Sequence, residues 1–263
     1  MARILSMSSQ VMRGHVGNSA AVPALQRLGH EVWPLPTVVL SNHPGHPTVA
    51  GTRIAPATLL AMVRALGANG WLGEIDAVST GYLPTADHVA AAAEAIKIVR
   101  AARPNTLVLV DPVLGDDPKG LYVDEAAARA VRDKLLPLAS IATPNRFELA
   151  WLSGRAVTDA GNAAAAAQAL GVRTVVATSV PGAEGHLINL LCTSEGCLEI
   201  AVPKQISAPH GTGDLLAALF LGRILGGASA SLALRAGVAD VQAAIAASAG
   251  ADELQLTASA PAR

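Results

Sequence analysis

Short β-branched runs alternate with Ala-rich helical stretches along most of this chain. Strands are expected at residues 2–7 and 32–40, with a helix at about 17–28 between them. Apolar residues at helical spacing predict the helices, and short apolar runs between turn residues predict buried strands. This order predicts an α/β fold with a mostly parallel sheet that is covered by helices on both faces. Further helices are expected at 56–66, 85–102, 125–135, 146–152 and 160–170, and further strands at 75–80, 106–110, 140–142 and 174–178.

The region after residue 185 departs from this alternation. Two apolar runs, 187–192 and 197–202, flank Thr-Ser-Glu-Gly and predict an antiparallel hairpin that extends one edge of the sheet. Cys192 and Cys197 fall in this hairpin, and no further Cys or His pair lies nearby to complete a metal site. We therefore expect both cysteines to be structural. Helices follow at 213–225 and 229–248, and the final residues, which contain Ala, Ser and Pro, are expected to be frayed.

The composition favours a protein that acts on a small molecule. Of the 263 residues, 51% are hydrophobic and 15% are charged, the net charge is −1, and like charges form no long run. No broad electrostatic field is therefore expected for nucleic acid or an anionic membrane. No stretch of about 18 apolar residues lacks charged residues, Pro and Gly, and the first residues lack the apolar core of a secretory signal. These observations predict one soluble, cytoplasmic domain over residues 1–263.

The segment Gly211-Thr-Gly-Asp214 is the most informative, because a glycine-rich turn here runs directly into an apolar helix. A helix N-terminus carries unpaired N–H groups and about half a positive charge. Gly211, Thr212 and Gly213 are therefore predicted to form an anion hole for a phosphoryl group. Asp214 beside it would accept the proton of an attacking alcohol. The alternative is that Asp214 only caps the helix, where Asp is favoured.

Two other phosphate-binding motifs do not fit the sequence. A dinucleotide-binding fingerprint needs Gly or Ala at position 216, where this chain has Leu216, and Pro-His rather than a strand precedes the turn. No Gly-x-x-x-x-Gly-Lys-Ser/Thr sequence occurs anywhere in the chain, which excludes a P-loop enzyme. Any ATP must therefore be held differently.

Two acidic motifs also follow predicted strands. Asp-Pro-Val-Leu-Gly-Asp begins at Asp111, and Thr-Pro-Asn-Arg-Phe-Glu ends at Glu148. Ligands of open parallel sheets bind at the carboxyl ends of the strands, so both motifs and Asp214 are expected at one edge. Mg²⁺ takes one or two carboxylates with waters and phosphate oxygens, a role that suits Asp111 and Glu148. Taken singly, each is more often a turn or cap residue, and it is their coincidence at one edge that favours the metal site.

Polar residues at other strand ends suit a polar, aromatic substrate. Ser9 precedes Gly14 and Gly17 and is predicted to bind a polar ring, while the glycines allow close approach of the ligand. His43 and Tyr82 follow the second and third predicted strands and would supply polar and stacking surfaces. His43 taken alone would more often be structural.

With these motifs together, the chain resembles the pyridoxal kinases of the ribokinase superfamily over nearly its whole length. Gly-Thr-Gly-Asp alone indicates a member of the superfamily, whereas Gly-His-Val-Gly-Asn with Ser-Asn-His is typical of the vitamin B6 branch. The resemblance implies a ribokinase-like three-layer α/β/α sandwich and transfer of the γ-phosphate of MgATP to the 5′-hydroxymethyl group of pyridoxal. The motifs that carry it are Gly14 to Ala21, Ser41-Asn-His43, Gly81-Tyr82, Asp111 to Gly115, Lys119-Gly120, Thr143 to Glu148 and Gly211 to Asp214.

The resemblance also implies roles for single residues. By similarity, Asp214 activates the 5′-hydroxyl, and the amides of residues 211–213 form the anion hole. Ser9 would contact the pyridine ring, with His43 and Tyr82 lining the substrate pocket. The ATP and its Mg²⁺ would be bound by Asp111, Asn145, Glu148, Thr178, Ser179, Thr212 and Gly213, of which Asp111 and Glu148 would act on Mg²⁺ directly or through water.

Further properties follow from the resemblance alone. Residues 116–123 would correspond to a flexible segment that closes over the site, in keeping with their Gly, Pro and charged residues. The protein would be a homodimer, and a monovalent cation such as K⁺ would be a further cofactor.

Two departures affect the substrate pocket. Many relatives have Thr after Ser-Asn-His, but this chain has Pro44, which lacks both a hydroxyl and a backbone N–H. Some bacterial relatives have Cys after Lys-Gly, where it can add to the pyridoxal aldehyde, but this chain has Leu121. The preference among pyridoxal, pyridoxine and pyridoxamine is therefore left open.

Two alternative functions are compatible with these motifs. A hydroxymethylpyrimidine kinase would present a similar ring and alcohol to a related fold. A B6-binding protein with little catalysis would keep the pocket, but the intact Gly-Thr-Gly-Asp and Asn-x-x-Glu sequences argue against it.

Overall fold

The structure is a computed structural model that describes residues 1–205 and 208–256. Its main sheet has nine strands, β1 (Arg3–Val11), β2 (Glu31–Leu40), β3 (Gly51–Arg53), β4 (Ala77–Thr80), β5 (Leu107–Val110), β8 (Ile141–Ala142), β9 (Thr174–Pro181), β10 (His186–Thr193) and β11 (Gly196–Pro203). The helices are α1 (Asn18–Arg27), α2 (Pro56–Ala68), α3 (Ala86–Ala102), α4 (Glu125–Ala130), α5 (Arg146–Ser153), α6 (Ala160–Ala169), α7 (Thr212–Leu225) and α8 (Ala230–Ala247).

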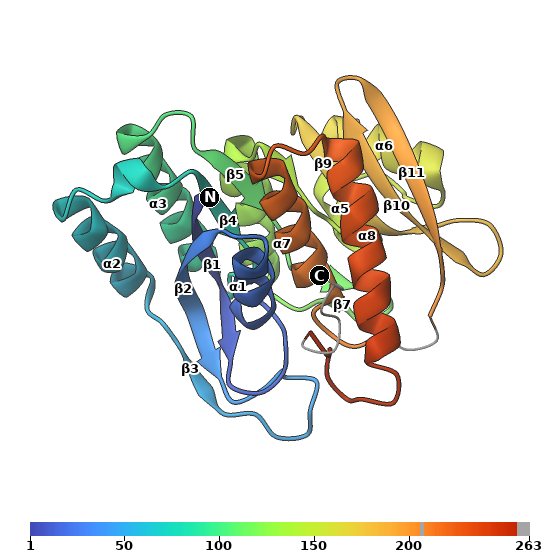
Figure 1. Cartoon of the computed structure of the whole chain (residues 1–263), viewed down its shortest axis with the longest axis horizontal. Coiled ribbons are helices and arrows are strands. Elements are labelled where there is room, and N and C mark those ends of the chain that lie inside the picture. The colour runs from blue at the N-terminus through green and yellow to red at the C-terminus, as the bar shows by residue number, and fades with distance from the viewer. Residues whose placement is uncertain (206–207, 257–263) are drawn as a thin grey trace.

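The strand order is β11-β10-β9-β8-β5-β4-β1-β2-β3 (Figure 1). The six strands from β2 to β9 along this order pair in parallel, whereas β3, β10 and β11 pair antiparallel at the two edges. The predicted parallel sheet and the predicted edge hairpin are therefore confirmed. Because the strands are parallel, their carboxyl ends meet at one edge, and the functional loops start there.

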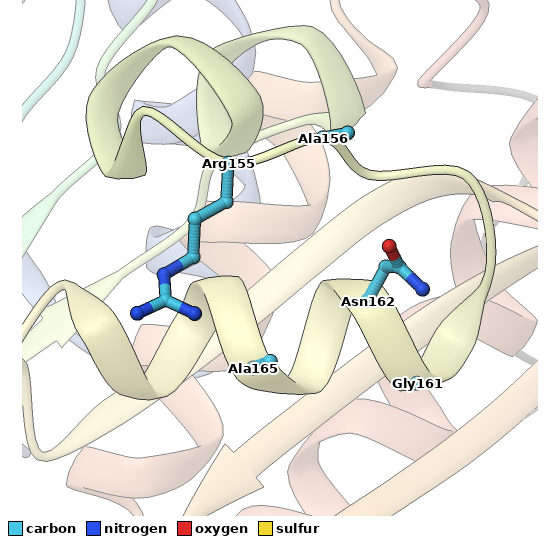
Figure 2. Close-up of a pocket in the computed structure, with 5 residues that line it drawn as sticks. All are labelled: Arg155, Ala156, Gly161, Asn162 and Ala165. Carbon is cyan, nitrogen blue, oxygen red and sulfur yellow. The ribbon is translucent and has the colours of Figure 1, made fainter.

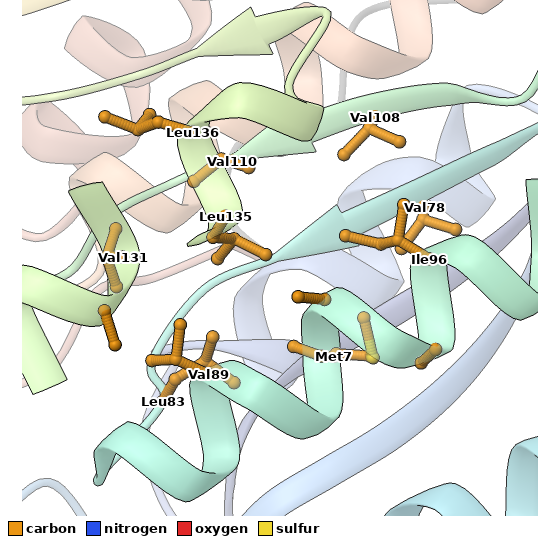
Figure 3. Close-up of a cluster of buried hydrophobic side chains, with 14 of the residues drawn as sticks. Met7, Val78, Leu83, Val89, Ile96, Val108, Val110, Val131, Leu135 and Leu136 are labelled. Atoms are coloured by element: carbon orange, nitrogen blue, oxygen red, sulfur yellow. The ribbon is translucent and has the colours of Figure 1, made fainter. Parts of the chain in front are cut away.

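Alternate side chains of each strand enter opposite cores, as the pleat requires. In β1, Leu5 and Met7 join the core under α2, α3 and α4, whereas Ile4 faces α1, α7 and α8. Figure 3 shows Met7 of β1 among side chains that include Val89 and Ile96 of α3. Helices thus cover both faces, and the three-layer α/β/α fold expected from the resemblance is confirmed.

The face that carries α1, α7 and α8 holds the helix that begins at the predicted anion hole. These three helices lie side by side in front of the sheet in Figure 1. Phe220 of α7 is completely buried in this core. α8 is long and apolar enough, by length and composition, to cross a membrane, but Leu234 and Val238 are buried against this core, as expected for a core helix. The packing of α7 fixes where its N-terminus points.

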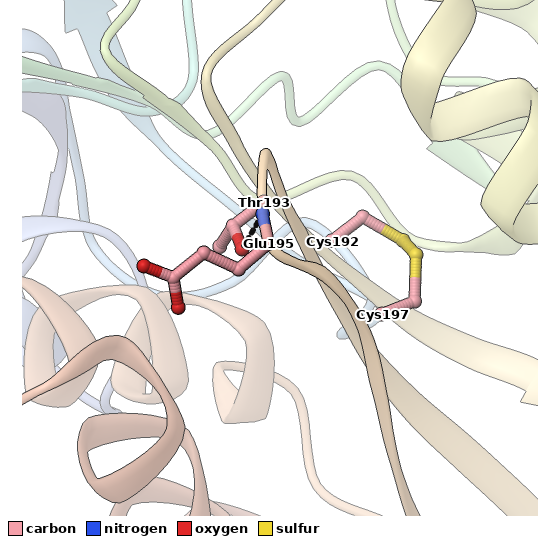
Figure 4. Close-up of a disulfide and its surroundings, with 4 residues drawn as sticks. All are labelled: Cys192, Thr193, Glu195 and Cys197. Atoms are coloured by element: carbon pink, nitrogen blue, oxygen red, sulfur yellow. Dashed lines mark hydrogen bonds between the residues drawn. A yellow bond between two sulfur atoms is a disulfide. The ribbon is translucent and has the colours of Figure 1, made fainter.

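The β10–β11 hairpin carries a disulfide bond that the sequence analysis did not predict. Cys192 and Cys197 are directly paired across the two strands, with Cα atoms 4.2 Å apart (Figure 4). Their expected structural role agrees with this arrangement.

Three short strands and the end of the described chain were not predicted. β3 extends the sheet beyond β2, and β6 (Gly115–Asp116) pairs with β7 (Gly120–Leu121) in a separate hairpin. After α8, residues 249–256 pack back onto the protein, with Leu254 and Leu256 buried. The prediction that the final residues, which contain Ala, Ser and Pro, are frayed falls outside the described residues, which end at 256.

Candidate active site

Three acidic residues from different elements meet at the carboxyl edge of the sheet. Asp111 directly follows β5, and its N–H donates to the carbonyl of Thr80 at 2.9 Å. Glu148 and Asp214 lie in the first turns of α5 and α7. The charges of Glu148 and Asp214 both raise the pKa of Asp111, which places the three carboxyl groups near one another.

Asp214 is held by backbone donors rather than used as a helix cap. The N-cap residue of α7 is Gly211, and no side chain caps this helix. The Asp214 carboxylate accepts hydrogen bonds from the N–H of Gly17 and from its own N–H. Although it keeps partial solvent access, burial raises its pKa to about 6, while these two N–H groups oppose the shift. A carboxyl group with this pKa is suited to accept a proton near neutral pH.

The turn before α7 has the geometry that an anion hole needs. Gly211 has a φ of +96°, and a Cβ added there would lie 1.8 Å from the carbonyl oxygen of His15. Gly211 is therefore required by the close packing of the two loops. Gly213 differs, because a Cβ added there would meet no atom within 4 Å. The helix N-terminus at Gly213 thus faces open space, where a phosphoryl group could approach.

Glu148 is buried and accepts three backbone N–H groups. Its Oε1 accepts from Leu114 at 2.7 Å and from Gly115 at 3.5 Å, and its Oε2 accepts from Asn145 at 2.9 Å. Burial raises its pKa to about 7 against the opposing effect of these donors. Asn145 and Glu148 also form a capping box at the start of α5, so Glu148 is a cap residue as well as part of the acidic group.

The acidic edge has features that suit a hard divalent cation. Burial, followed by the charges of Glu148 and Asp214, raises the pKa of Asp111 well above its ordinary value. Asp116 Oδ1 is buried without a hydrogen-bond partner among the described residues. Within residues 1–205 and 208–256, no group of three or more His, Cys, Asp or Glu residues has the arrangement of a complete protein-only metal site. Mg²⁺ bound with a nucleotide requires fewer protein ligands, so the residues present fit this ion.

The predicted ATP-binding residues on α5 and β9 are only partly brought together. Asn145 forms a β-bridge with Thr178, whose N–H donates to the carbonyl of Pro144 at 3.0 Å. The Asn145 side chain accepts from the Glu148 N–H and donates to the Gly115 carbonyl at 2.7 Å, so it links the acidic edge to the β6–β7 hairpin. Ser179 follows on β9, exposed and with a φ of 58°, a backbone conformation unusual for a non-glycine residue.

The predicted acceptor pocket lies beside the first strand. A Cβ added to Gly17 would lie 2.2 Å from Ser9 Oγ, so the first turn of α1 packs tightly against Ser9. Tyr82 donates its N–H to Ser8 Oγ at 3.2 Å, which ties the end of β4 to β1. Because Gly17 also donates to Asp214, it joins the predicted ring-binding residue to the predicted base. The sequence analysis quoted Gly17 in a motif but did not predict this contact.

His43, which is also predicted to line the acceptor pocket, stacks on a second imidazole. The rings of His43 and His210 have centroids 3.9 Å apart and planes inclined by 23°. Burial, followed by the neighbouring His210, lowers the pKa of His43 to about 4, so His43 is neutral at physiological pH. Its Nδ1 accepts from the Gly45 N–H at 3.0 Å, which leaves Nε2 as the protonated nitrogen. The sequence analysis missed His210, although it directly precedes the glycine-rich turn.

The predicted closing segment forms the β6–β7 hairpin above these groups. The Lys119 charge lowers the pKa values of His43 and His210, so this hairpin lies near the imidazole pair. Asp117 forms an ion pair with Arg146 of α5. Leu121, at the position of the covalent Cys in some relatives, packs against the hydrophobic core instead.

Val113, at the base of this segment, was not predicted as a site residue. It has a φ of 46°, which is strained for a β-branched residue. It follows Asp111 by two residues and precedes Leu114, whose N–H binds Glu148. The strained turn therefore directs a backbone donor at the buried carboxylate.

The hollow in Figure 2 lies elsewhere and holds none of the predicted site residues. It has a volume of about 370 Å³ and lies between the end of α5 and α6, where it is lined by Arg155, Ala156, Gly161, Asn162 and Ala165.

The layered fold, the acidic sheet edge and the glycine-rich helix start define a small-molecule kinase. The phosphomethylpyrimidine kinase family matches residues 49–258 of the chain. Pyridoxal kinase PdxY from Rubrobacter xylanophilus is 40% identical over 97% of this chain and 91% of its own length. The pyridoxine/pyridoxal/pyridoxamine kinase of Bordetella avium is 39% identical over 89% of this chain and 81% of its own length.

A solved structure of a pyridoxal kinase is also similar to this chain. Pyridoxal kinase from Leishmania donovani in complex with ADP and pyridoxamine is 33% identical, with a TM-score of 0.90 over 98% of this chain and 91% of that protein. The chain therefore belongs to the pyridoxal kinases of the ribokinase superfamily, and it is an ATP-dependent kinase.

The two glycines of the turn should respond differently to alanine. Gly213→Ala should fold with a melting temperature within about 2 °C of the wild type, since the new methyl group meets open space. It should lower kcat/KM for MgATP about tenfold or more, because the methyl group occupies the approach to the anion hole.

Gly211→Ala serves as the contrast and should lower the melting temperature markedly, since its Cβ meets the His15 carbonyl at a positive φ. Thermal unfolding and steady-state kinetics measure both effects. Unchanged kinetics for Gly213→Ala would contradict the assigned anion hole.

Asp214→Asn should stabilise the ligand-free protein in a pH-dependent way. The folded pKa of about 6 lies above the ordinary pKa of 3.8, so an ionised Asp214 destabilises the fold above pH 6. This penalty decreases as pH falls through 6 and vanishes below the unfolded pKa, where both states bind the proton. The variant should therefore gain roughly 1–2 kcal/mol at pH 8, a value reduced for partial exposure, and about half of that at pH 5. Urea unfolding without Mg²⁺ at pH 5, 6.5 and 8 measures this gain, and a gain independent of pH would disprove the assignment.

Proposed function

We propose that this protein transfers the γ-phosphate of MgATP to the 5′-hydroxymethyl group of pyridoxal, with pyridoxine and pyridoxamine as further candidate acceptors. The product with pyridoxal would be pyridoxal 5′-phosphate, made in vitamin B6 salvage. The single observation that carries the proposal is the position of Asp214. Its carboxylate lies in the first turn of α7, beside the predicted anion hole, and it accepts from the N–H of Gly17, a residue that packs against Ser9.

The donor side would bind charge with backbone amides. The N–H groups of residues 211–213 would stabilise negative charge that develops on the transferred phosphoryl group. Thr178, Ser179 and Asn145 would approach the other phosphates of ATP. Because the packing of α7 and the His15 contact hold the turn in place, these donors need little rearrangement during the reaction.

The acidic residues would hold Mg²⁺. When bound, this ion neutralises charge on the phosphate oxygens and orients them. Asp111 would contact it directly. Both oxygens of Glu148 already accept backbone N–H groups, so Glu148 would act on the ion through water.

The acceptor side would position the alcohol. Ser9, Tyr82 and the neutral His43 would bind the pyridine ring and its substituents, and Asp214 would take the proton of the 5′-hydroxyl as the oxygen attacks phosphorus in line. The β6–β7 hairpin would close over the site and exclude water.

Other expected properties remain part of this proposal. We propose that residues 1–263 form one kinase domain, since strands from both halves of the chain build one sheet. The resemblance supports a cytoplasmic homodimer without nucleic-acid or membrane partners, and a monovalent cation such as K⁺.

A panel of acceptors tests the substrate. We expect purified protein with MgATP to release ADP fastest with pyridoxal, when pyridoxine, pyridoxamine and hydroxymethylpyrimidine are offered in parallel. Mass spectrometry identifies the phosphorylated product. Turnover confined to the pyrimidine would keep the fold and mechanism but replace the substrate, and no turnover on any of the four would favour a B6-binding protein.

Asp214→Asn should separate binding from chemistry. The substitution should leave binding of MgATP and pyridoxal nearly intact and lower the chemical step by a factor of about 10² to 10⁴, as for a lost general base. Rapid-quench kinetics with calorimetric binding measures both quantities. Near wild-type turnover would remove Asp214 from this role.

A further inference from the structure

The chain beyond α8 returns to the acceptor side of the site. Residues 249–256 run back along the loops that carry the predicted substrate residues, and Leu254 and Leu256 anchor this return because they are buried at 0% and 7% exposure. We call residues 249–256 the C-terminal clasp. The charged residues of the clasp are Asp252 and Glu253.

Glu253 is the buried charge of the clasp. Its side chain is 6% exposed, and Oε1 lies 2.7 Å from His46 Nε2 and 3.3 Å from Arg13 Nη1. Oε2 lies over Gly14, where an added Cβ would approach it to 2.4 Å. One carboxylate thus contacts both the β1–α1 loop, through Arg13 and Gly14, and the β2–β3 loop, through His46.

The clasp also supports the anion hole through His15. The Nδ1 atom of His15 pairs with the Leu254 carbonyl at 2.5 Å. The carbonyl of His15 in turn lies against Gly211, so close that a Cβ added to Gly211 would lie 1.8 Å from its oxygen. The position of the β1–α1 loop therefore depends on the clasp on one side and sets the turn before α7 on the other.

The β2–β3 loop presents His43 to the substrate pocket. Its base is closed by a hydrogen bond from the Ser41 N–H to the Ala50 carbonyl at 2.7 Å. Between these ends, His46 is held by Glu253, and His43 stacks on His210. The Asn42 side chain donates to the carbonyls of His43 and Thr48 within the loop, whereas Glu253 ties the loop to the C-terminal clasp.

We propose that Glu253 is a positioning residue for the acceptor pocket, acting through His46 and Arg13 to hold the loops that carry His43 and Gly14. This inference rests on the proposed function for its substrate. A buried carboxylate is expensive to desolvate, and here two cationic or donor side chains from two loops compensate it. Its removal frees Arg13 and His46, while His15 keeps its bond to the backbone carbonyl of Leu254. The turn before α7, Asp214 and the ATP residues therefore keep their contacts.

We expect loss of Glu253 to raise KM for the acceptor and to leave KM for MgATP nearly unchanged. Glu253→Ala should raise KM for pyridoxal about tenfold or more and leave KM for MgATP within about twofold, because a loosened loop misplaces only the acceptor contacts. Glu253→Gln should recover most of the loss, since its amide oxygen can still accept from His46 Nε2–H.

Two variants test whether Glu253 acts through His46. His46→Ala should reproduce the part of the Glu253→Ala effect that acts through the β2–β3 loop, and the double variant should be no worse than Glu253→Ala, as expected for two partners of one contact. Asp252→Asn is the matched control in the same clasp. Asp252 is 62% exposed and pairs only with Arg13 among these groups, so its loss should change neither KM by more than about twofold.

A substrate-free measurement separates this inference from the proposed function. Hydrogen exchange should become faster in residues 12–14 and 41–50 for Glu253→Ala and in residues 41–50 for His46→Ala, but in neither segment for Asp252→Asn, whatever the acceptor is. If the wild-type protein does not phosphorylate pyridoxal, the proposed function is wrong, but the hydrogen-exchange test of Glu253 still applies. Equal changes in both KM values, additive single effects, or exchange confined to the clasp would overturn the positioning role. If Glu253→Ala does not fold, Glu253→Gln and His46→Ala decide the question by the same readouts.

Discussion

The charges of Glu148 and Asp214 both act on Asp111, and this crowding of carboxyl groups away from bulk water is the constraint on which the site depends. Ionised carboxylates repel one another and lose hydration when they are buried, so each is driven toward its protonated form. Under the proposed function, a divalent cation bound with a polyphosphate would resolve that conflict, because the cation would compensate the carboxylates. The same unfavourable electrostatics of the free protein would then favour binding of a metal nucleotide.

Backbone N–H groups keep these carboxyl groups in position without neutralising them. Glu148 accepts from Leu114, Gly115 and Asn145, and Asp214 accepts from Gly17 and from its own N–H. Such donors are fixed by the fold and carry no titratable proton. They lower pKa values that burial raises, which leaves Glu148 at about 7 and Asp214 at about 6. Both groups are thus kept close to the pH at which a proton can be exchanged.

The grouping of Asp111, Glu148 and Asp214 at one edge of the sheet could be predicted from the sequence because its signals are local. Each acidic motif directly follows a strand, and the parallel topology alone brings the strand ends together. The short strands β3, β6 and β7 were missed because two or three residues carry no periodicity. The disulfide was missed because pairing depends on register across the hairpin, which the spacing of Cys192 and Cys197 does not determine.

The acceptor side could not be predicted to the same depth, because its loops are shaped by contacts between distant parts of the chain. Glu253 and His46 are 207 residues apart, and His15 and Leu254 are 239 residues apart. No local pattern reveals such pairs, and Glu253 stands in a stretch whose sequence resembles an ordinary polar end. This dependence on long-range contacts also has a physical consequence. A phosphoryl-transfer apparatus built from strand ends is constrained by the sheet, whereas an acceptor pocket built from clasped loops can change its substrate by changing a few tertiary contacts. Departures such as Pro44 and Leu121 fall on that adaptable side, and the donor side retains its motifs intact.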